Sequence, residues 1–344
     1  KKGDKILSML PMAHMYGMMF ELIYPLCGGS SIYYLGKTPT PALLLGAMAE
    51  VKPYLVITVP LVMEKIFKSK VAPVVNKPVM KVITSIPGLN QIIFKKIRNT
   101  LLNAFGGKVR EIVMGGAALN PDVEKWFRRF KLPFTVGYGM TECAPLISFE
   151  LPTLFKLGSC GKVLPGLLEA RIDSRDPKNI PGELLIKGEH VMLGYYKNEA
   201  ATKAVLEEDG WLHTGDMCTM DDDNTLYIRG RCKTMILSGS GQNIYPEEIE
   251  ERLNNLYMVA ESLIIENNGR LTALVVPDYE LANAEGVDMD KLPEIMEQNL
   301  QQLNTMVASY EKVANIVIHR EEFIKTPKRS IKRYLYSAER LNLG

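Results

Sequence analysis

The sequence predicts an α/β domain followed by a smaller α+β domain. The chain has 344 residues, more than the ~250–300 at which a single hydrophobic core stops growing, so two domains are expected. Apolar runs alternate with helical patterns over residues 1–232, which is typical of α/β domains. Over residues 233–344 the pattern changes to two helices and a hairpin. We therefore place the domain boundary between residues 232 and 233.

The first domain is expected to begin with a buried strand and helix in the apolar stretch 6–35. His14, Glu21 and several glycines and prolines interrupt this stretch, so it does not fit a membrane span. The sequence also shows no secretory signal with a cleavage site.

Two later strands of this domain are expected to end in glycine turns. Residues 111–114 form an apolar run before a Gly-Gly pair, and residues 133–136 form another before the turn at Tyr138. A helix is predicted between them, with Asn120 as N-cap and proline and acidic residues in its first turn. Because open α/β sheets bind ligands at the carboxyl ends of their strands, both turns are candidate ligand sites.

The remaining elements follow from residue periodicity and turn chemistry. An amphipathic helix with acidic residues in its first turn opens the second domain, and a hairpin with the turn Asn267-Asn268-Gly269 follows it. The predicted strands are 182–186, 225–228, 262–265 and 271–276, and the predicted helices are 246–253 and 293–310.

Composition favours a soluble cytoplasmic enzyme. Hydrophobic residues make up 47% of the chain, enough to fill a sizeable core. The five cysteines have neither metal-ligand spacing nor the pattern of a disulfide framework, which indicates a reducing compartment.

Charge is distributed unevenly along the chain. The net charge is +2, yet residues 65–110 contain Lys and Arg and no Asp or Glu. One interpretation is a solvated basic face. The other is attraction to an anionic membrane surface, on the inner membrane face, or to the phosphates of coenzyme A, because apolar residues alternate with these charges. Nucleic acid is not expected as a partner, since no recognition motif accompanies the charge.

Three polar clusters occur in order along the chain. They read Gly-Tyr-Gly-Met-Thr-Glu at 137–142, Trp-Leu-His-Thr-Gly-Asp at 211–216 and Gly-Arg-Cys-Lys at 230–233. Each alone is consistent with ordinary turn and capping chemistry. Together they supply what a nucleotide needs: an aromatic face at Tyr138, a hydroxyl at Thr141, a carboxylate for Mg²⁺ at Glu142, an acceptor at Asp216 and a forked donor at Arg231.

In this order the clusters resemble those of the adenylate-forming enzymes, which include acyl-CoA synthetases, adenylation domains of peptide synthetases, and luciferases. The resemblance extends over the whole chain and is closest to bacterial long-chain fatty acid CoA ligases. It is carried by Leu-Pro-Met-Ala-His-Met-Tyr-Gly at 10–17, Met-Gly-Gly-Ala-Ala-Leu at 114–119, Gly-Glu-Leu-Leu-Ile-Lys-Gly at 182–188 and the run from Gly230 to Glu250. It implies part of a large AMP-binding domain, a hinge, and a small C-terminal domain.

The resemblance also implies an activity and a set of site residues. The activity is ATP-dependent conversion of a fatty acid to its acyl-adenylate and then to a CoA thioester, with ATP, Mg²⁺ and coenzyme A. Glu142 would bind the metal and Thr141 a phosphate. His14 would orient the acyl group, gate the access of the thiol, or serve only as a core residue. The hinge would be Lys233. The adenylate and CoA would lie against Gly115, Gly116, Ala117, Tyr138, Gly139, Met140, Asp216, Ile228, Arg231, Ser240, Gly241 and Gln242.

Two departures from the family pattern qualify these expectations. The phosphate-binding loop of the family should precede His14, so we expect the chain to be a fragment that lacks it. Near the C-terminus the family reads Thr-Pro-x-Gly-Lys-x-x-Arg, whereas residues 326–333 read Thr-Pro-Lys-Arg-Ser-Ile-Lys-Arg. Ser330 thus occupies the position of the catalytic lysine. Lys328 and Lys332 share a face with it in an extended segment, and we favour Lys332; the alternative is a solvated basic tail.

Two other functions remain open. An acyl-adenylating enzyme could transfer its product to the thiol of a carrier protein instead of CoA. A regulatory protein could bind nucleotide or acyl groups without turnover, which would account for Ser330 and for the absent loop. The sequence predicts neither the acyl chain length nor the oligomeric state.

Overall fold

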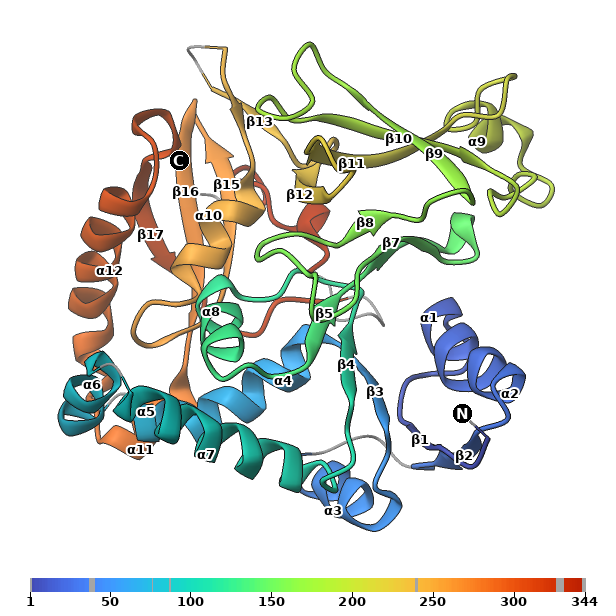
Figure 1. Cartoon of the computed structure of the whole chain (residues 1–344). Helices are drawn as coiled ribbons and strands as arrows, with labels where there is room; N and C mark the ends of the chain where they lie inside the picture. The colour runs from blue at the N-terminus through green and yellow to red at the C-terminus, as the bar shows by residue number, and fades with distance from the viewer. Residues whose placement is uncertain are drawn as a thin grey trace. The chain divides into compact units, whose positions relative to one another are not determined.

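The computed structural model describes residues 2–36, 41–75, 77–86, 88–238, 241–325 and 331–341 (Figure 1). The chain divides into two compact units. The first comprises Lys1–Thr214 and Cys218–Ile228, and the second comprises Gly215–Met217 and Arg229–Gly344. The boundary expected at 232/233 therefore lies just inside the second unit.

A five-stranded parallel sheet forms the centre of the first unit (Figure 1). The strand order is β2-β1-β3-β4-β5, and each neighbouring pair is parallel. The strands are β1 (Lys5–Ser8), β2 (Ser31–Tyr34), β3 (Leu55–Thr58), β4 (Glu111–Met114) and β5 (Phe134–Val136).

The central strand β3 is buried on both faces, as expected inside a parallel sheet, whereas the edge strand β2 is largely exposed. In β3, Val56 belongs to one cluster of buried side chains, while Leu55 and Ile57 belong to another. The helices of the unit are α1 (Met15–Gly17), the π-helix η1 (Met18–Ile23), α2 (Tyr24–Cys27), α3 (Pro41–Val51), α4 (Pro60–Ile66), the π-helix η2 (Phe67–Val71), α5 (Ala72–Val75), α6 (Pro78–Ser85), α7 (Leu89–Ala104) and α8 (Pro121–Arg129).

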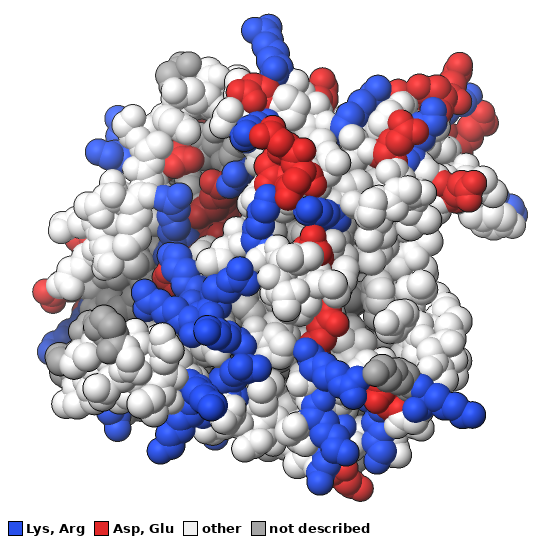
Figure 2. Space-filling model, in the orientation of Figure 1, with Lys and Arg blue, Asp and Glu red and all other residues white. Residues whose placement is uncertain are grey.

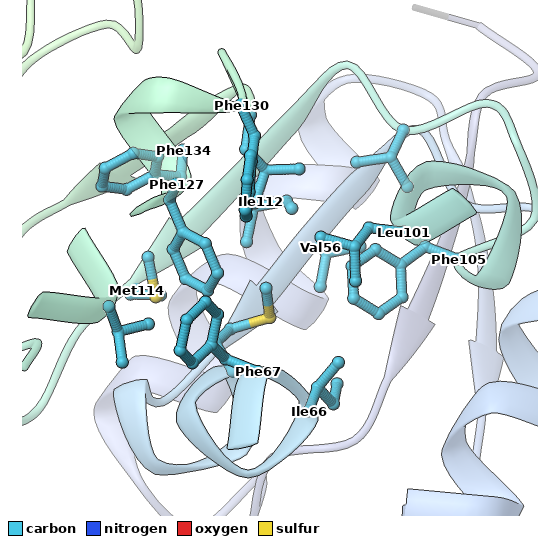
Figure 3. Close-up of a cluster of buried hydrophobic side chains, with 14 of the residues drawn as sticks. Val56, Ile66, Phe67, Leu101, Phe105, Ile112, Met114, Phe127, Phe130 and Phe134 are labelled. Atoms are coloured by element: carbon cyan, nitrogen blue, oxygen red, sulfur yellow. The ribbon is translucent and has the colours of Figure 1, made fainter. Parts of the chain in front are cut away.

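The larger cluster joins α3, α4, α7 and α8 to the sheet. Figure 3 shows Phe127 of α8 between Phe67 and the sheet residues of this core. Its ring lies 6.0 Å from that of Phe67 and 5.6 Å from that of Phe134, both edge to face. Such pairs are favourable beyond the area that they bury.

Two smaller sheets follow along the chain. The sheet β6-β7-β8 is antiparallel, and the other sheet has the order β12-β11-β10-β9, in which β9 and β10 are antiparallel. Residues 215–217 on β11 and 229–231 on β12 belong to the second unit. The elements are β6 (Tyr138–Gly139), η3 (Thr141–Cys143), β7 (Leu146–Phe149), β8 (Lys162–Val163), β9 (Leu168–Asp173), β10 (Gly182–Gly188), α9 (Glu199–Lys203), β11 (Leu212–Met220) and β12 (Leu226–Arg231).

The second unit is an α+β structure with its own core. The hairpin β15-β16 is antiparallel, and β17 joins it in parallel. The elements are β13 (Ile236–Leu237), β14 (Asn243–Ile244), α10 (Pro246–Leu253), β15 (Val259–Asn267), β16 (Arg270–Pro277), α11 (Tyr279–Glu285), η4 (Met289–Lys291), α12 (Leu292–Met306), η5 (Ser309–Glu311), β17 (Val313–Ile318) and η6 (Arg333–Leu335).

Most predicted elements are confirmed, and the differences lie at their ends. The hairpin strands are longer than 262–265 and 271–276, because the pairing continues to the Asn268-Gly269 turn at one end and to Val259 and Pro277 at the other. The helix predicted at 293–310 ends at Met306, where Val307 is extended and a separate 3-10 turn follows. Among the described residues, no helix combines the length and apolarity needed to cross a bilayer.

Candidate active site

Two glycine turns lie at neighbouring ends of the parallel sheet, as the sequence predicts. The Gly115 N–H donates to the Thr58 carbonyl at 3.2 Å, and the Gly137 N–H donates to the Met114 carbonyl at 2.9 Å. Gly116 and Ala117 are exposed beyond β4, and Gly116 has a φ of 86°. The carboxyl edge of the sheet therefore presents small, open backbone, where parallel sheets commonly bind ligands.

Tyr16 fastens the segment that contains His14 to this edge. Its hydroxyl lies 3.1 Å from the Thr58 carbonyl and 3.2 Å from the Val113 carbonyl. A Cβ at Gly115 would lie only 3.2 Å from Cζ of the Tyr16 ring. Any larger residue at position 115 would have to displace the Tyr16 ring slightly, a contact that the sequence analysis did not anticipate.

His14 is the N-cap of the helical segment that begins at Met15. Its Nδ1 accepts a hydrogen bond from the Tyr16 N–H at 3.1 Å. This bond places the ring proton on Nε2. His14 thus has a structural role, and an acyl contact would use the Nε2 edge of the ring.

Glu21 anchors the chain that leads into this segment. Its Oε2 accepts from the Ser8 hydroxyl at 3.2 Å and from the N–H groups of Met9 and Leu10 at 3.0 and 2.8 Å. The side chain is fully buried, and burial raises the pKa of its carboxyl to about 7. A single acidic residue inside the apolar stretch 6–35 was the signal that could have identified this anchor.

The turn from Tyr138 to Glu142 is shaped by close backbone contacts. A Cβ at Gly139 would lie 2.0 Å from the Pro145 carbonyl oxygen, so only glycine fits at this position. The Met140 N–H donates to the same carbonyl at 2.9 Å. Tyr138 is half-buried and packs against apolar side chains of this part of the unit. Thr141 is exposed at the start of η3.

Glu142 is oriented by the segment that precedes α9. The Tyr195 hydroxyl donates to Glu142 Oε1 at 3.0 Å, and the Met192 N–H donates to the Glu142 carbonyl at 2.8 Å. Burial and the Glu142 carboxylate both raise the pKa of Tyr195, so its hydroxyl stays protonated as a donor. The sequence analysis did not assign Tyr195 this role.

The chemistry of Glu142 fits Mg²⁺. In the described part of the chain, no three His, Cys, Asp or Glu side chains form a group that could hold a metal ion. Mg²⁺ commonly binds one or two carboxylates together with water and substrate phosphates. A half-buried carboxylate with one oxygen fixed by Tyr195 meets that requirement.

Asp216 and Arg231 form an ion pair within the second unit. Arg231 Nε donates to Asp216 Oδ1 at 2.7 Å. The aspartate is 5% exposed, whereas the arginine side chain is 61% exposed. Gly215, with a φ of 70°, accepts from the Cys232 N–H at 2.9 Å and so joins the two segments. Ile228 belongs to the first unit, where it is half-buried against the core.

His213, in the same motif as Asp216, connects two strands to a loop. Its Nδ1 lies 2.9 Å from Glu183 on β10, and its Nε2 lies 2.9 Å from Glu207. The hydrogen bond with Glu183 is the main cause of its raised pKa. This arrangement gives His213 a structural role.

The other predicted residues of the second unit lie in turns. The Ser238 hydroxyl accepts from the Gln242 N–H at 2.9 Å, and the Gly241 N–H donates to the Ser238 carbonyl at 2.9 Å. Ser240 lies outside the described residues. Lys233 is exposed in a turn that the Thr234 hydroxyl ties to Glu247 at 2.7 Å. Its role as a hinge stays a prediction.

Arg333 fixes the position of the segment that contains Lys332, the candidate catalytic lysine. Arg333 donates to both carboxylate oxygens of the buried Glu250, at 2.8 Å from Nη1 to Oε1 and by a shorter contact from Nη2 to Oε2. The Lys332 N–H donates to the Ile324 carbonyl at 2.8 Å. Lys332 is half-buried, and Lys328 and Ser330 lie outside the described residues. The choice among them stays a prediction.

Residues 1–196 match the family of AMP-binding enzymes. This is more than half of the chain, which therefore belongs to that family. Both the resemblance to adenylate-forming enzymes and the α/β fold class are confirmed.

The relatives are CoA ligases of different specificity. The chain is 29% identical over 318 residues to the long-chain-fatty-acid–CoA ligase ACSBG2 of Rattus norvegicus, covering 85% of this chain and 47% of the relative. It is 28% identical over 304 residues to 4-coumarate–CoA ligase 3 of Arabidopsis thaliana, covering 84% and 48%. The chain thus spans about half the length of these relatives.

The fold is also found in solved structures. The o-succinylbenzoate CoA synthetase of Bacillus subtilis, in complex with ATP and magnesium ion, has a TM-score of 0.71 and 23% identity to this chain. The match covers 96% of this chain and 61% of that one. At this identity the comparison establishes the fold.

Proposed function

We propose that the protein uses ATP to activate a carboxylic acid as its acyl-adenylate and then transfers the acyl group to coenzyme A. The observation that carries this proposal is the Glu142 carboxylate, oriented by Tyr195 beside the exposed Thr141, in a turn that follows the parallel sheet. Membership of the AMP-binding enzyme family supports it.

The first half-reaction brings anions together. A carboxylate oxygen attacks the α-phosphorus of ATP, the bond from that phosphorus to the bridging oxygen breaks, and pyrophosphate leaves. Catalysis therefore requires cations and fixed donors where the charge accumulates. Mg²⁺ would supply charge neutralisation at the phosphates, with Glu142 as its protein ligand.

The first unit would bind the base and the phosphates. Tyr138 presents an aromatic face for adenine, and Gly116 and Ala117 leave room for the base to approach the backbone. The Thr141 hydroxyl would donate to a phosphate oxygen. Gly116 and Ala117 follow β4, Tyr138 lies on β6 after the end of β5, and Thr141 begins η3.

The second unit would bind the sugar and the developing charge. The Asp216 carboxylate would accept from the ribose hydroxyls, and Arg231, which already bonds it, would hold it in place. Lys332 is our candidate for the cation that stabilises the transition state.

The second half-reaction forms the thioester. The sulfur of coenzyme A attacks the acyl carbonyl carbon, the bond from that carbon to the phosphate oxygen of AMP breaks, and the thiol proton passes to solvent. Rotation at Lys233 would admit the thiol, and the turn with Gly241 and Gln242 would lie along its path.

The test is turnover with ATP, a carboxylic acid and coenzyme A, followed as AMP release and acyl-CoA formation. Glu142→Gln should lower the rate by about a hundredfold or more, since it removes a preorganised charge. Glu169→Gln, an exposed position on β9, is the matched control and should leave the rate unchanged. Equal rates for both variants would remove Glu142 from the reaction.

We further propose a long-chain fatty acid as the acid substrate. The named specificity of the rat relative supports it, whereas the Arabidopsis relative is named for 4-coumarate. With palmitate and 4-coumarate as competing acids, kcat/KM should favour palmitate by at least about tenfold. A preference for 4-coumarate would overturn the chain-length assignment and leave the reaction type intact.

Two alternatives have distinct outcomes in the same assays. A carrier-loading enzyme would release AMP only when a carrier protein with a phosphopantetheine thiol replaces CoA. A regulatory protein would bind AMP without turnover. Calorimetry would detect AMP binding by a regulatory protein that shows no turnover. Asp216→Ala is the variant that should lose this binding.

A further inference from the structure

An exposed apolar surface lies at α6 and the beginning of α7. Val79 and Ile92 are 67% and 71% exposed, and Ile86 and Leu89 are 42% and 50% exposed. We call these four residues the apolar tip. Four exposed large aliphatic side chains within fourteen positions, 79–92, are unusual for a surface that only faces water.

The residues of the apolar tip are not part of the hydrophobic core of the unit. On α7, Phe94, Ile97 and Leu101 face the core, and Phe94 packs edge to face with Trp126 and Phe130 of α8 at 6.2 and 5.6 Å. Leu89 and Ile92 lie outside this cluster. The first turns of α7 therefore carry apolar side chains on two faces. One face packs against the core, and the other is exposed.

Three lysines lie close to the apolar tip in the sequence. Lys77, Lys95 and Lys96 are exposed, and the described part of the chain places no acidic side chain in an ion pair with any of the three. No Asp or Glu occurs between positions 65 and 110. Figure 2 shows Lys and Arg over α7 and α8, beside a region at α5 and α6 without Lys, Arg, Asp or Glu atoms.

We propose that the surface formed by the apolar tip and Lys77, Lys95 and Lys96 docks on an anionic lipid membrane. The aliphatic side chains would enter the boundary between headgroups and acyl chains, while the lysines would contact lipid phosphates. Contacts with phosphates dominate the affinity of proteins for nucleic acid, so four exposed aliphatic side chains would contribute nothing to such a binding surface. Combined apolar and basic character matches the chemistry of a lipid surface.

This surface gives the protein direct access to its substrate if the acid is a long-chain fatty acid, a consequence that rests on the proposed function. The docking itself is independent of catalysis. Its test therefore measures binding to lipid and uses no turnover.

The experiment is co-sedimentation of the protein with vesicles of phosphatidylcholine alone or with added phosphatidylglycerol, at low and high salt. We expect binding to the anionic vesicles that weakens as salt rises, because exposed charges are screened over about 8–10 Å at physiological ionic strength. Lys95→Glu with Lys96→Glu should weaken binding by about fivefold or more for each lysine.

Two further variants make the result specific. Leu89→Ser with Ile92→Ser should weaken binding to anionic vesicles severalfold and leave the thermal midpoint unchanged, since both side chains are exposed. Lys197→Glu with Lys203→Glu makes the same charge change elsewhere on this unit and should retain binding. Equal loss in this control, unchanged binding in the serine variant, or tighter binding to single-stranded RNA than to vesicles would overturn the proposal.

Discussion

At the scale of single residues, the hydrogen bond from Tyr195 to Glu142 is the contact that makes a metal role testable. The hydroxyl lies 3.0 Å from Oε1 and orients the carboxylate. Groups that orient a metal ligand often change metal affinity by about 10–100-fold when removed. Tyr195→Phe keeps the ring and removes the donor, so we expect the Mg²⁺ concentration for half-maximal activity to rise by about tenfold, measured by magnesium titration at saturating ATP.

The neighbouring tyrosine supplies the control. Tyr196 is 88% exposed and has the same chemistry, so Tyr196→Phe should leave the magnesium titration unchanged. If Tyr195→Phe also leaves it unchanged, the hydrogen bond orients nothing that the metal uses.

Glu21 gives a prediction about pH. Its pKa is about 7 in the folded protein, because burial disfavours the ionised form, and close to 4.5 in the unfolded chain. A folded-state pKa above the unfolded value contributes stability that is present below about pH 4.5 and is lost as the pH rises through about 7. Relative to wild type, Glu21→Gln should be nearly neutral at about pH 5 and more stable by about 1–3 kcal/mol at about pH 8.

Urea unfolding at the two pH values measures this difference in the free energy of unfolding. Glu50→Gln changes an exposed glutamate of α3 and should show no such dependence on pH. A Glu21→Gln variant that is equally destabilised at both pH values would mean that the native carboxyl is ionised throughout and needed for its three hydrogen bonds.

At the scale of elements, two glycines differ in how much space surrounds them. Gly139 has no room for a Cβ, because the Pro145 carbonyl oxygen would lie 2.0 Å away. A Cβ at Gly46, inside α3, would meet no atom of the described residues within 4 Å beyond its own helix backbone. Gly139→Ala should destabilise the protein and weaken AMP binding, since the turn must open. Gly46→Ala should stabilise it by about 0.5–1 kcal/mol through helix propensity. Thermal unfolding and AMP calorimetry of both variants check this, and a neutral Gly139→Ala would contradict the close contact.

The elements themselves were largely predictable, because their signals are local. The strand at 111–114, the Asn120 cap and the helix at 246–253 follow from apolar runs and capping chemistry, and the structure has all three. The lengths of β15 and β16 were not predictable in this way, since pairing extends through polar residues near the turn. Contacts between distant positions, such as Tyr16 with Thr58 and Arg333 with Glu250, leave no periodic signal in the sequence.

At the scale of the whole molecule, the chain has separate cores for its two compact units. One core lies between the parallel sheet and its helices, and another lies between α10, α12 and the strands of the second unit. Arg333 holds the C-terminal segment to the second core through Glu250, which is almost fully buried. Removing one partner of a buried ion pair commonly costs about 3–5 kcal/mol, because the other charge is left unpaired.

Because the cores are separate, we expect a mutation in one core to destabilise only the unit that contains it. Arg333→Met should raise amide hydrogen exchange in peptides from α10, β15 and β16 and leave exchange in peptides from β3, β4 and β5 unchanged, as measured by mass spectrometry. Ile112→Ala, in the core of the parallel sheet, should give the reverse pattern, because a cavity there weakens only the packing around it. If either variant raises exchange equally in both sets of peptides, the units unfold together, and the Glu250–Arg333 pair stabilises the whole molecule instead of the segment that carries Lys332.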